Sequence, residues 1–192
     1  SLHTMNAYEE NGQLVLDILE ADRPFYDQYY AEPGLFADIG PSRIRRTRLD
    51  CSGWSFTDTR ILEPGLHLDF PCIDPQRLGT RYRYAWVPGM PTDPAASVKF
   101  YDRLLCLDWD GPTLGEAYQC PDGRFLSAEP QLIAHPDEPE TGLLVLQEQD
   151  VSGPNTDYVF FDTRAPAQGP LARVRLPFFD PPCFHTALKR NA

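Results

Sequence analysis

The chain has 192 residues, of which 42% are hydrophobic and 23% are charged. Seventeen basic residues against 28 acidic ones give a formal net charge of −11, which repels a phosphate backbone and argues against nucleic acid as a partner. No apolar run approaches the roughly 18 residues that a membrane-spanning helix needs, and no basic-then-apolar leader begins at Ser1. The five cysteines form no CxxC pair, so we expect reduced thiols in a cytoplasmic protein, with a disulfide framework the weaker alternative.

Short runs rich in Val, Ile, Leu, Tyr and Phe alternate with turn residues along the chain, which is typical of an all-β protein. The pairs Asn11-Gly12, Asp110-Gly111 and Asp122-Gly123 predict tight turns, and the 20 prolines stand mostly singly between apolar runs. No linker divides the sequence, so residues 1–192 are interpreted as one unit. The expected strands are Gln13–Glu20, Arg43–Leu49, Thr59–Leu62, Leu66–Phe70, Tyr82–Val87, Val98–Asp108, Leu114–Gln119, Gln131–Ala134, Gly142–Gln149, Tyr158–Thr163 and Ala172–Leu176, with a short helix or irregular insert at Pro24–Phe36.

One basic cluster stands out in this acidic sequence. It consists of Arg43, Arg45, Arg46 and Arg48. We interpret it as a solvated strand face, with contact to an acidic partner or a lipid headgroup as the alternative.

Four histidines are the residues most able to carry chemistry, because no P-loop, GxGxxG, GxSxG or HExxH motif appears. They are His3, His67, His135 and His185. Any one of them alone is more often a hydrogen-bonded structural residue than a metal ligand. Their sequence surroundings therefore decide between the two interpretations.

Five segments, in order, resemble the carotenoid cleavage oxygenases, the family that includes lignostilbene dioxygenases and the retinal pigment epithelium isomerase. Residues 2–17 resemble the family's FHxxNAxEExGxxVxD segment, and residues 68–74 resemble its EFPxIN strand. Gly79 to Ala85 follows that strand as in the family. Residues 115–116 and 127–133 resemble the GEPxFVP strand, and residues 172–177 leading into Phe184-His185 resemble the LPxRVPxGFHG ending.

This resemblance implies a seven-bladed β-propeller with an Fe(II) centre held by four histidines, where O2 cleaves a C=C bond of a carotenoid, apocarotenoid or stilbenoid into carbonyl products. His3 matches the third ligand and His185 the fourth, while Asp69 and Glu129 match two of the glutamates that orient the ligand rings. A carboxylate that accepts the other ring N–H fixes the tautomer and angle of an imidazole ligand. His67 and His135 are not expected to bind the metal.

The sequence departs from the family pattern at both ligands. Asp69 stands where the family has Glu, which shortens its reach by about 1.5 Å, so we expect a bridging water or a looser His3 ring. Thr186 replaces a glycine, and residues 179–183 replace RVPxG, so the loop that carries His185 is expected to be altered.

The segments with the first two ligands are expected before Ser1. At roughly 40–50 residues per blade, 192 residues supply about four C-terminal blades. We therefore expect a missing N-terminal propeller segment as a partner of this chain. The alternative is a non-catalytic remnant or interaction module. Peripheral membrane contact stays open, since the family's substrates are apolar.

Several further side chains have two interpretations each. Trp54, Phe56 and Phe100 could line an apolar tunnel, but packing in the core is the preferred interpretation. Cys72 and Cys183 are expected to be buried thiols rather than ligands.

Overall fold

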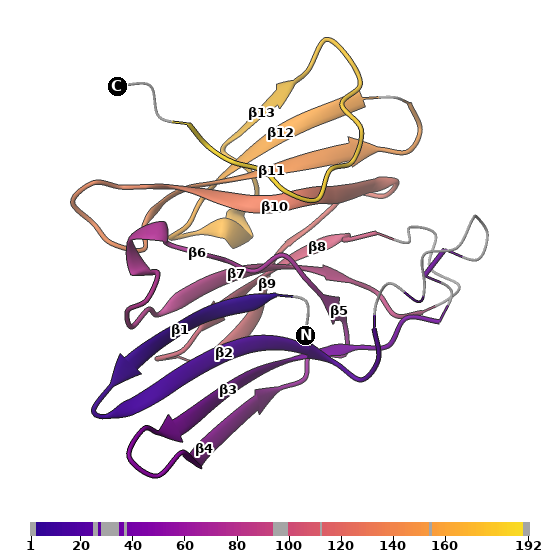
Figure 1. The fold of residues 1–192 in the computed structure, drawn as a ribbon. Helices are drawn as coiled ribbons and strands as arrows, with labels where there is room; N and C mark the ends of the chain where they lie inside the picture. The colour runs from indigo at the N-terminus through magenta and orange to yellow at the C-terminus, as the bar shows by residue number, and fades with distance from the viewer. Residues whose placement is uncertain are drawn as a thin grey trace.

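The computed structural model describes residues 3–24, 27, 35–36, 38–93, 100–111, 113–153 and 155–189, which form three antiparallel sheets stacked one after another (Figure 1). The first sheet contains β1 (Thr4–Glu10), β2 (Gln13–Ala21), β3 (Ser42–Asp50) and β4 (Ser55–Leu62) in that order. The middle sheet has the order β5 (His67–Leu68), β7 (Tyr84–Met90), β8 (Arg103–Asp108) and β9 (Thr113–Gln119), and β6 (Cys72–Ile73) also pairs with β7. The last sheet contains β10 (Arg124–Ala134), β11 (Gly142–Asp150), β12 (Asn155–Asp162) and β13 (Ala172–Arg175).

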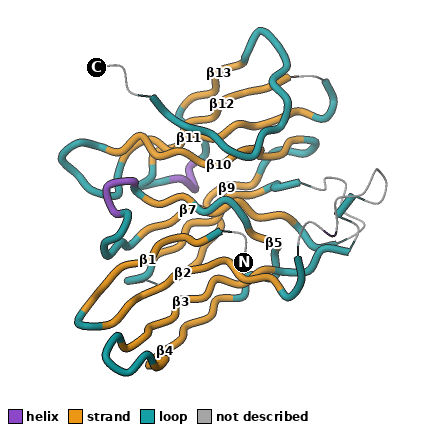
Figure 2. The backbone as a smooth tube through the Cα atoms, viewed as in Figure 1, coloured by secondary structure: helices purple, strands orange, loops and turns teal. Residues whose placement is uncertain are grey.

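Helical structure is slight among the described elements, which are mainly strands and their connections (Figure 2). Two short 3-10 turns, η2 (Pro75–Arg77) and η3 (Pro166–Gln168), each begin with a proline. No helix in the described part of the chain is long and apolar enough to cross a membrane.

Alternation of buried and half-buried residues explains why these segments form strands. In β2, Val15, Asp17 and Leu19 are buried and their neighbours are half-buried, the period-2 pattern of a sheet with one face in a core. Two hydrophobic clusters result. One contains Val15, Ile44, Leu107 and their neighbours, and the other contains Trp86, Leu104, Leu144, Phe161 and theirs. The cores therefore lie between neighbouring sheets, so each sheet is a layer that needs a partner on its face.

The sequence predictions of the strands are largely confirmed, with local differences. β1 was not predicted, because its residues Thr4–Glu10 are half polar. The strand expected at Leu66–Phe70 is reduced to His67–Leu68. Of the long strand expected at Val98–Asp108, residues 98 and 99 lie outside the described residues, and β8 begins at Arg103. Of the insert expected at Pro24–Phe36, most lies outside the described residues.

Three blade-like sheets account for the described strands. Each sheet with its connections takes more chain than the roughly 40–50 residues assumed for a blade. A further stretch after β13, residues 176–189, forms no strand.

The basic cluster on β3 is used within the first sheet. Arg43 pairs with Asp22, Arg45 with Glu20, Arg46 with Asp17, and Arg48 with Glu10. Asp17 is fully buried, and its carboxylate takes two hydrogen bonds from Arg46 at 2.7 and 2.6 Å and one from the Tyr82 hydroxyl at 2.6 Å. These arginines therefore satisfy acidic side chains of the same sheet or the segment next to it.

The aromatic residues near the β3–β4 turn correct one sequence prediction. Trp54 and Phe56 are not core residues, since they are 75% and 76% exposed. A hydrophobic side chain at a hairpin tip carries the same sequence signal as one in a core, because composition does not report depth. Phe100 does pack against the core between the middle and last sheets, stacked on Phe125 at 4.6 Å between ring centroids.

The segment after β13, which we call the C-terminal strap (residues 176–189), returns across the last sheet toward the middle of the molecule (Figure 1). The Leu176 N–H donates to the Thr156 carbonyl at 2.9 Å, and the Glu129 N–H donates to the Phe184 carbonyl at 3.1 Å. The strap therefore runs from the outer strands of the last sheet to β10. It brings His185 near the start of the chain.

Candidate metal site

The first half of the candidate site joins His3, directly before β1, to Asp69, directly after β5. The His3 Nδ1 contacts the Asp69 Oδ1. The His3 carbonyl accepts a hydrogen bond from the Leu19 N–H at 3.2 Å, so its backbone is tied to β2. Asp69 is buried, and its N–H donates to the Pro88 carbonyl at 3.4 Å. The shorter aspartate therefore reaches the ring directly, without the bridging water that its length suggested.

A local turn aims the Asp69 carboxylate. Phe70 has a φ of 53°, a left-handed conformation that is uncommon for an aromatic residue. Its N–H donates to the Asp69 Oδ1 at 2.9 Å. Its ring lies 5.3 Å from that of His3 and 6.3 Å from that of His185, measured between centroids. The turn after β5 thus holds the carboxylate and packs an apolar ring against both imidazoles.

The second half joins His185, on the strap, to Glu129, within β10. The His185 Nδ1 lies 2.9 Å from the Glu129 Oε1. This half is far more open than the first, since the His185 side chain is 71% exposed and that of His3 is 25% exposed. Glu129 lies where the pairing of β10 with β11 is interrupted, between Ser127 and Gln131. That irregularity leaves the backbone of Glu129 available to the strap.

Thr186 fastens the loop that carries His185. Its hydroxyl donates to the Glu129 carbonyl at 2.9 Å, and its N–H lies 3.4 Å from the Glu129 Oε2. Thr186 is not among the described residues with positive φ, so the conformation that would favour glycine is absent here. The sequence shows only that Thr186 stands where the family pattern has glycine. Its bonds to Glu129 could not be found without the structure.

The two halves meet. The rings of His3 and His185 are 6.2 Å apart between centroids, and donor atoms of His3, Glu129 and His185 lie within 4.8 Å of one another. A hydrogen bond from Nδ1–H to a carboxylate gives each imidazole the tautomer whose Nε2 carries the lone pair. Neutral imidazole suits iron. The donor set therefore fits a divalent iron ion, with His3 and His185 as the residues that would hold it.

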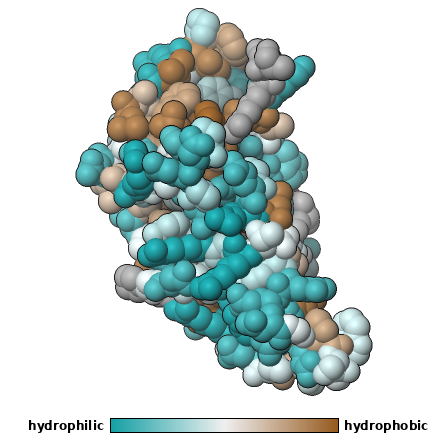
Figure 3. All heavy atoms as spheres, turned by 90° about the vertical axis from the view of Figure 1, so that its left-hand side faces the viewer, coloured by the Kyte–Doolittle hydropathy of each residue, from teal (hydrophilic) through white to brown (hydrophobic). Residues whose placement is uncertain are grey.

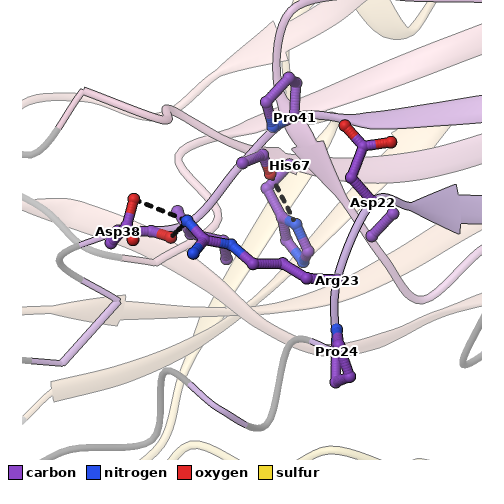
Figure 4. Close-up of a pocket in the computed structure, with 9 residues that line it drawn as sticks. Asp22, Arg23, Pro24, Asp38, Pro41 and His67 are labelled. Atoms are coloured by element: carbon purple, nitrogen blue, oxygen red, sulfur yellow. Dashed lines mark hydrogen bonds and ion pairs between the residues drawn. The ribbon is translucent and has the colours of Figure 1, made fainter.

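His67 lies in a different place. It is buried beside Ser42 and Gly40, with its Nδ1 3.1 Å from the Ser42 hydroxyl and 3.3 Å from the Gly40 carbonyl. It lines a cavity of about 160 Å³ together with Arg23 and Asp38, which pair with each other (Figure 4). Burial lowers the pKa of His67, and the nearby Asp69 carboxylate partly opposes this. These contacts are those of a neutral structural histidine.

His135 is an exposed residue in the β10–β11 connection. Its ring Nδ1 accepts a hydrogen bond from the Asp137 backbone N–H at 3.2 Å, and the His135 backbone N–H donates to the Thr141 carbonyl at 2.8 Å. It does not join the donor group formed by His3, Glu129 and His185. The structure therefore brings together the four predicted site residues and leaves the other two histidines outside.

Comparison with known proteins gives one family match and a consistent set of structural matches. The family model described as retinal pigment epithelial membrane protein, RPE65, matches residues 1–187. No curated protein sequence matches the chain significantly.

Solved structures share the fold. Cobalt-substituted Synechocystis ACO is 19% identical, with a TM-score of 0.80, over 98% of this chain and 39% of that one. A mutant of Synechocystis apocarotenoid oxygenase is 20% identical, with a TM-score of 0.80, over 95% and 38%. An ACO/RPE65 chimera in a trigonal crystal form is 21% identical, with a TM-score of 0.79, over 95% and 38%.

At these identities the structural likeness establishes the fold, which is that of the propeller-type oxygenases. The chain spans less than two fifths of the length of those structures. The family match, in contrast, covers nearly the whole chain. The chain therefore belongs to the family of the retinal pigment epithelial membrane protein and the carotenoid cleavage oxygenases.

Proposed function

We propose that this chain supplies two of the four histidine ligands of an Fe(II) centre in an oxygenase that cleaves a C=C bond of a carotenoid, apocarotenoid or stilbenoid. The observation that carries the proposal is the meeting of two imidazoles, each bonded through Nδ1 to a carboxylate, from opposite ends of the chain. Such pairs are typical of metal-binding histidines. Bound iron would supply the redox chemistry with O2 that converts an electron-rich double bond into two carbonyl groups.

The chain's own residues have defined roles in this proposal. Asp69 and Glu129 each accept a hydrogen bond from the Nδ1–H of one ring, which selects the tautomer with its lone pair on Nε2 and fixes the direction of the ring. Phe70 packs against both rings and limits the access of water on its side. Together these contacts prepare the donor atoms before a metal ion arrives, which lowers the cost of ordering them.

Metal binding tests the ligand assignment. Under anaerobic conditions we expect His3→Ala and His185→Ala each to weaken Fe(II) binding by at least about tenfold, because each removes a ligand. His135→Ala is the matched control, since this exposed histidine makes no contact with the site. Affinities equal to that of the parent in both ligand variants would rule out the assignment.

We further propose that additional propeller blades cover the outer faces of the first and last sheets. Exposed large hydrophobic side chains lie on both, among them Ile61 on β4 and Ile133, Leu143 and Val174 on β10, β11 and β13. None of the exposed large hydrophobic residues in the described part of the chain lies on a strand of the middle sheet, which has a neighbour on each side. Figure 3 shows hydrophobic side chains gathered over the upper part of the molecule, where the last sheet lies.

Reconstitution tests this partnership. A second polypeptide with the remaining blades of a family member should bind the chain and give aldehyde products from a polyene, whereas the chain alone should not. Leu143→Glu should weaken the association, since it places a charge on the face to be buried. Stoichiometric iron and polyene cleavage by the chain alone would overturn this proposal. Binding of a partner without iron or product would instead favour an interaction module.

A further inference from the structure

The strap is fastened to the last sheet by a buried polar cluster, which we call the latch. Its members are Asp180 on the strap, Gln147 and Gln149 on β11, and Thr156 on β12. The three sheet residues are between 0% and 2% exposed. Buried polar side chains are costly unless they are hydrogen-bonded, so a cluster of this kind fixes one arrangement of the groups that satisfy it.

Asp180 makes four hydrogen bonds in the latch, one as a donor and three as an acceptor. Its N–H donates to the Thr156 hydroxyl at 3.0 Å, and its carbonyl accepts from the same hydroxyl at 2.9 Å and from the Gln149 amide at 2.8 Å. Its carboxylate accepts from the Gln147 amide at 2.8 Å. Three of these four contacts use the backbone of Asp180, so the latch holds the path of the strap itself and not only one side chain.

The residues after Asp180 transmit this position to His185. Pro181 and Pro182 follow directly, and each fixes its own φ and removes a backbone donor. The residue before a proline is confined to extended conformations, which includes Asp180 itself. Four residues therefore separate Asp180 from His185, and the first two of them are the prolines that stiffen the connection. At its far end, Thr186 bonds to Glu129.

We propose that the latch positions His185, which makes Thr156 and Asp180 positioning residues of the metal site. The expected effect on metal binding rests on the proposed function. The expected effect on the position of the strap does not. The sequence offers no motif for it. Residues 179–183 are where the chain departs from the family ending, and the latch is what this departure builds.

Thr156→Val tests the inference in the full chain, because valine has the same shape and lacks the hydroxyl. Thr163→Val is the matched control: the Thr163 hydroxyl likewise bonds one N–H and one carbonyl, both of Gly142, at another place in the last sheet. Thr156→Ser should restore the parent behaviour, since serine keeps the hydroxyl. Three readouts apply to each variant: amide hydrogen exchange of residues 178–189, mobility of the His185 imidazole by NMR relaxation, and Co²⁺ affinity.

We expect Thr156→Val to raise hydrogen exchange in the strap about tenfold, to increase the mobility of the His185 ring, and to weaken Co²⁺ binding about five- to tenfold. Thr163→Val should change none of these. A strap and a His185 ring that move no more in Thr156→Val than in Thr163→Val would overturn the inference. The inference would also be overturned if the parent binds Co²⁺ and Thr156→Val, despite a loosened strap, binds it with the same affinity. If the parent binds no metal but the ring is loosened, the latch stands and the proposed function fails.

Discussion

The two halves of the candidate site differ in how the chain builds them. His3 is continuous with β1, and its partner Asp69 is buried at the end of β5, so both side chains are placed by the sheets that form the cores. His185 lies on a strap outside the regular strands, is largely exposed, and depends on bonds to Glu129 and the latch. One half is thus fixed by folding of the sheets, and the other by a segment that docks on them.

The difference predicts unequal effects when the carboxylates are removed, and this is the largest effect that we expect. Asp69→Ala should weaken Fe(II) binding by up to about 100-fold, because it removes a buried acceptor from both the His3 ring and the Phe70 N–H. Glu129→Ala should weaken Fe(II) binding by only about tenfold, since the ring that Glu129 orients, that of His185, is largely exposed to solvent. Anaerobic Fe(II) titration measures both.

Asp69→Asn is the control for this comparison, because its side-chain oxygen can still accept from His3 and Phe70. It should fall between the parent and Asp69→Ala. Equal losses in Asp69→Ala and Glu129→Ala would show that burial of the carboxylate does not separate the two halves.

Acidic pH should destabilise the last sheet, on which the His185 half of the site depends. Hydrogen bonds from Arg175, Arg124 and Arg173 hold the pKa of Asp157 well below its usual range. A lowered folded-state pKa stabilises the fold fully above the unfolded value, near 3.9, and this stability is lost as the pH falls below it. Between pH 5 and about pH 2.5, the hydrogen-exchange protection factors of amides in β10–β13, which are corrected for the intrinsic exchange rate at each pH, should therefore fall more in the parent than in Asp157→Asn, which is already destabilised at pH 5. The same fall in both proteins would show that Asp157 has no part in it.

The smallest effect that we expect is a difference in the reactivity of two cysteines, Cys72 near the His3 half of the site and Cys183 near the His185 half. Burial raises the pKa of Cys72, three residues after Asp69, to about 12. The pKa of Cys183, two residues before His185, is also raised by burial and by Asp180, but this thiol is only half-buried. Iodoacetamide at pH 8 should modify Cys183 faster than Cys72, measured by mass spectrometry of the intact fold. Faster modification of Cys72 would mean that the β5–β6 segment opens more readily than the strap.

The candidate site residues are predicted from the order of five motifs, and not from any local pattern at the histidines. His3 and His185 are separated by almost the whole chain, and no periodicity joins residues at such a distance. The strands were predictable from alternation where one face is buried, as in β2, and not where a strand is half polar, as in β1. The latch was not predictable, because its glutamines and threonine look like ordinary polar strand residues.

The most direct test of the account is a count of the imidazole ligands on the metal. Pulsed EPR of the Cu²⁺-substituted protein reports coordinated histidine nitrogens. We predict that His3→Ala and His185→Ala each reduce the number by one, while His67→Ala and His135→Ala leave it unchanged. An unchanged number in either of the first two variants would contradict the claim that the ends of this chain meet to bind one metal ion.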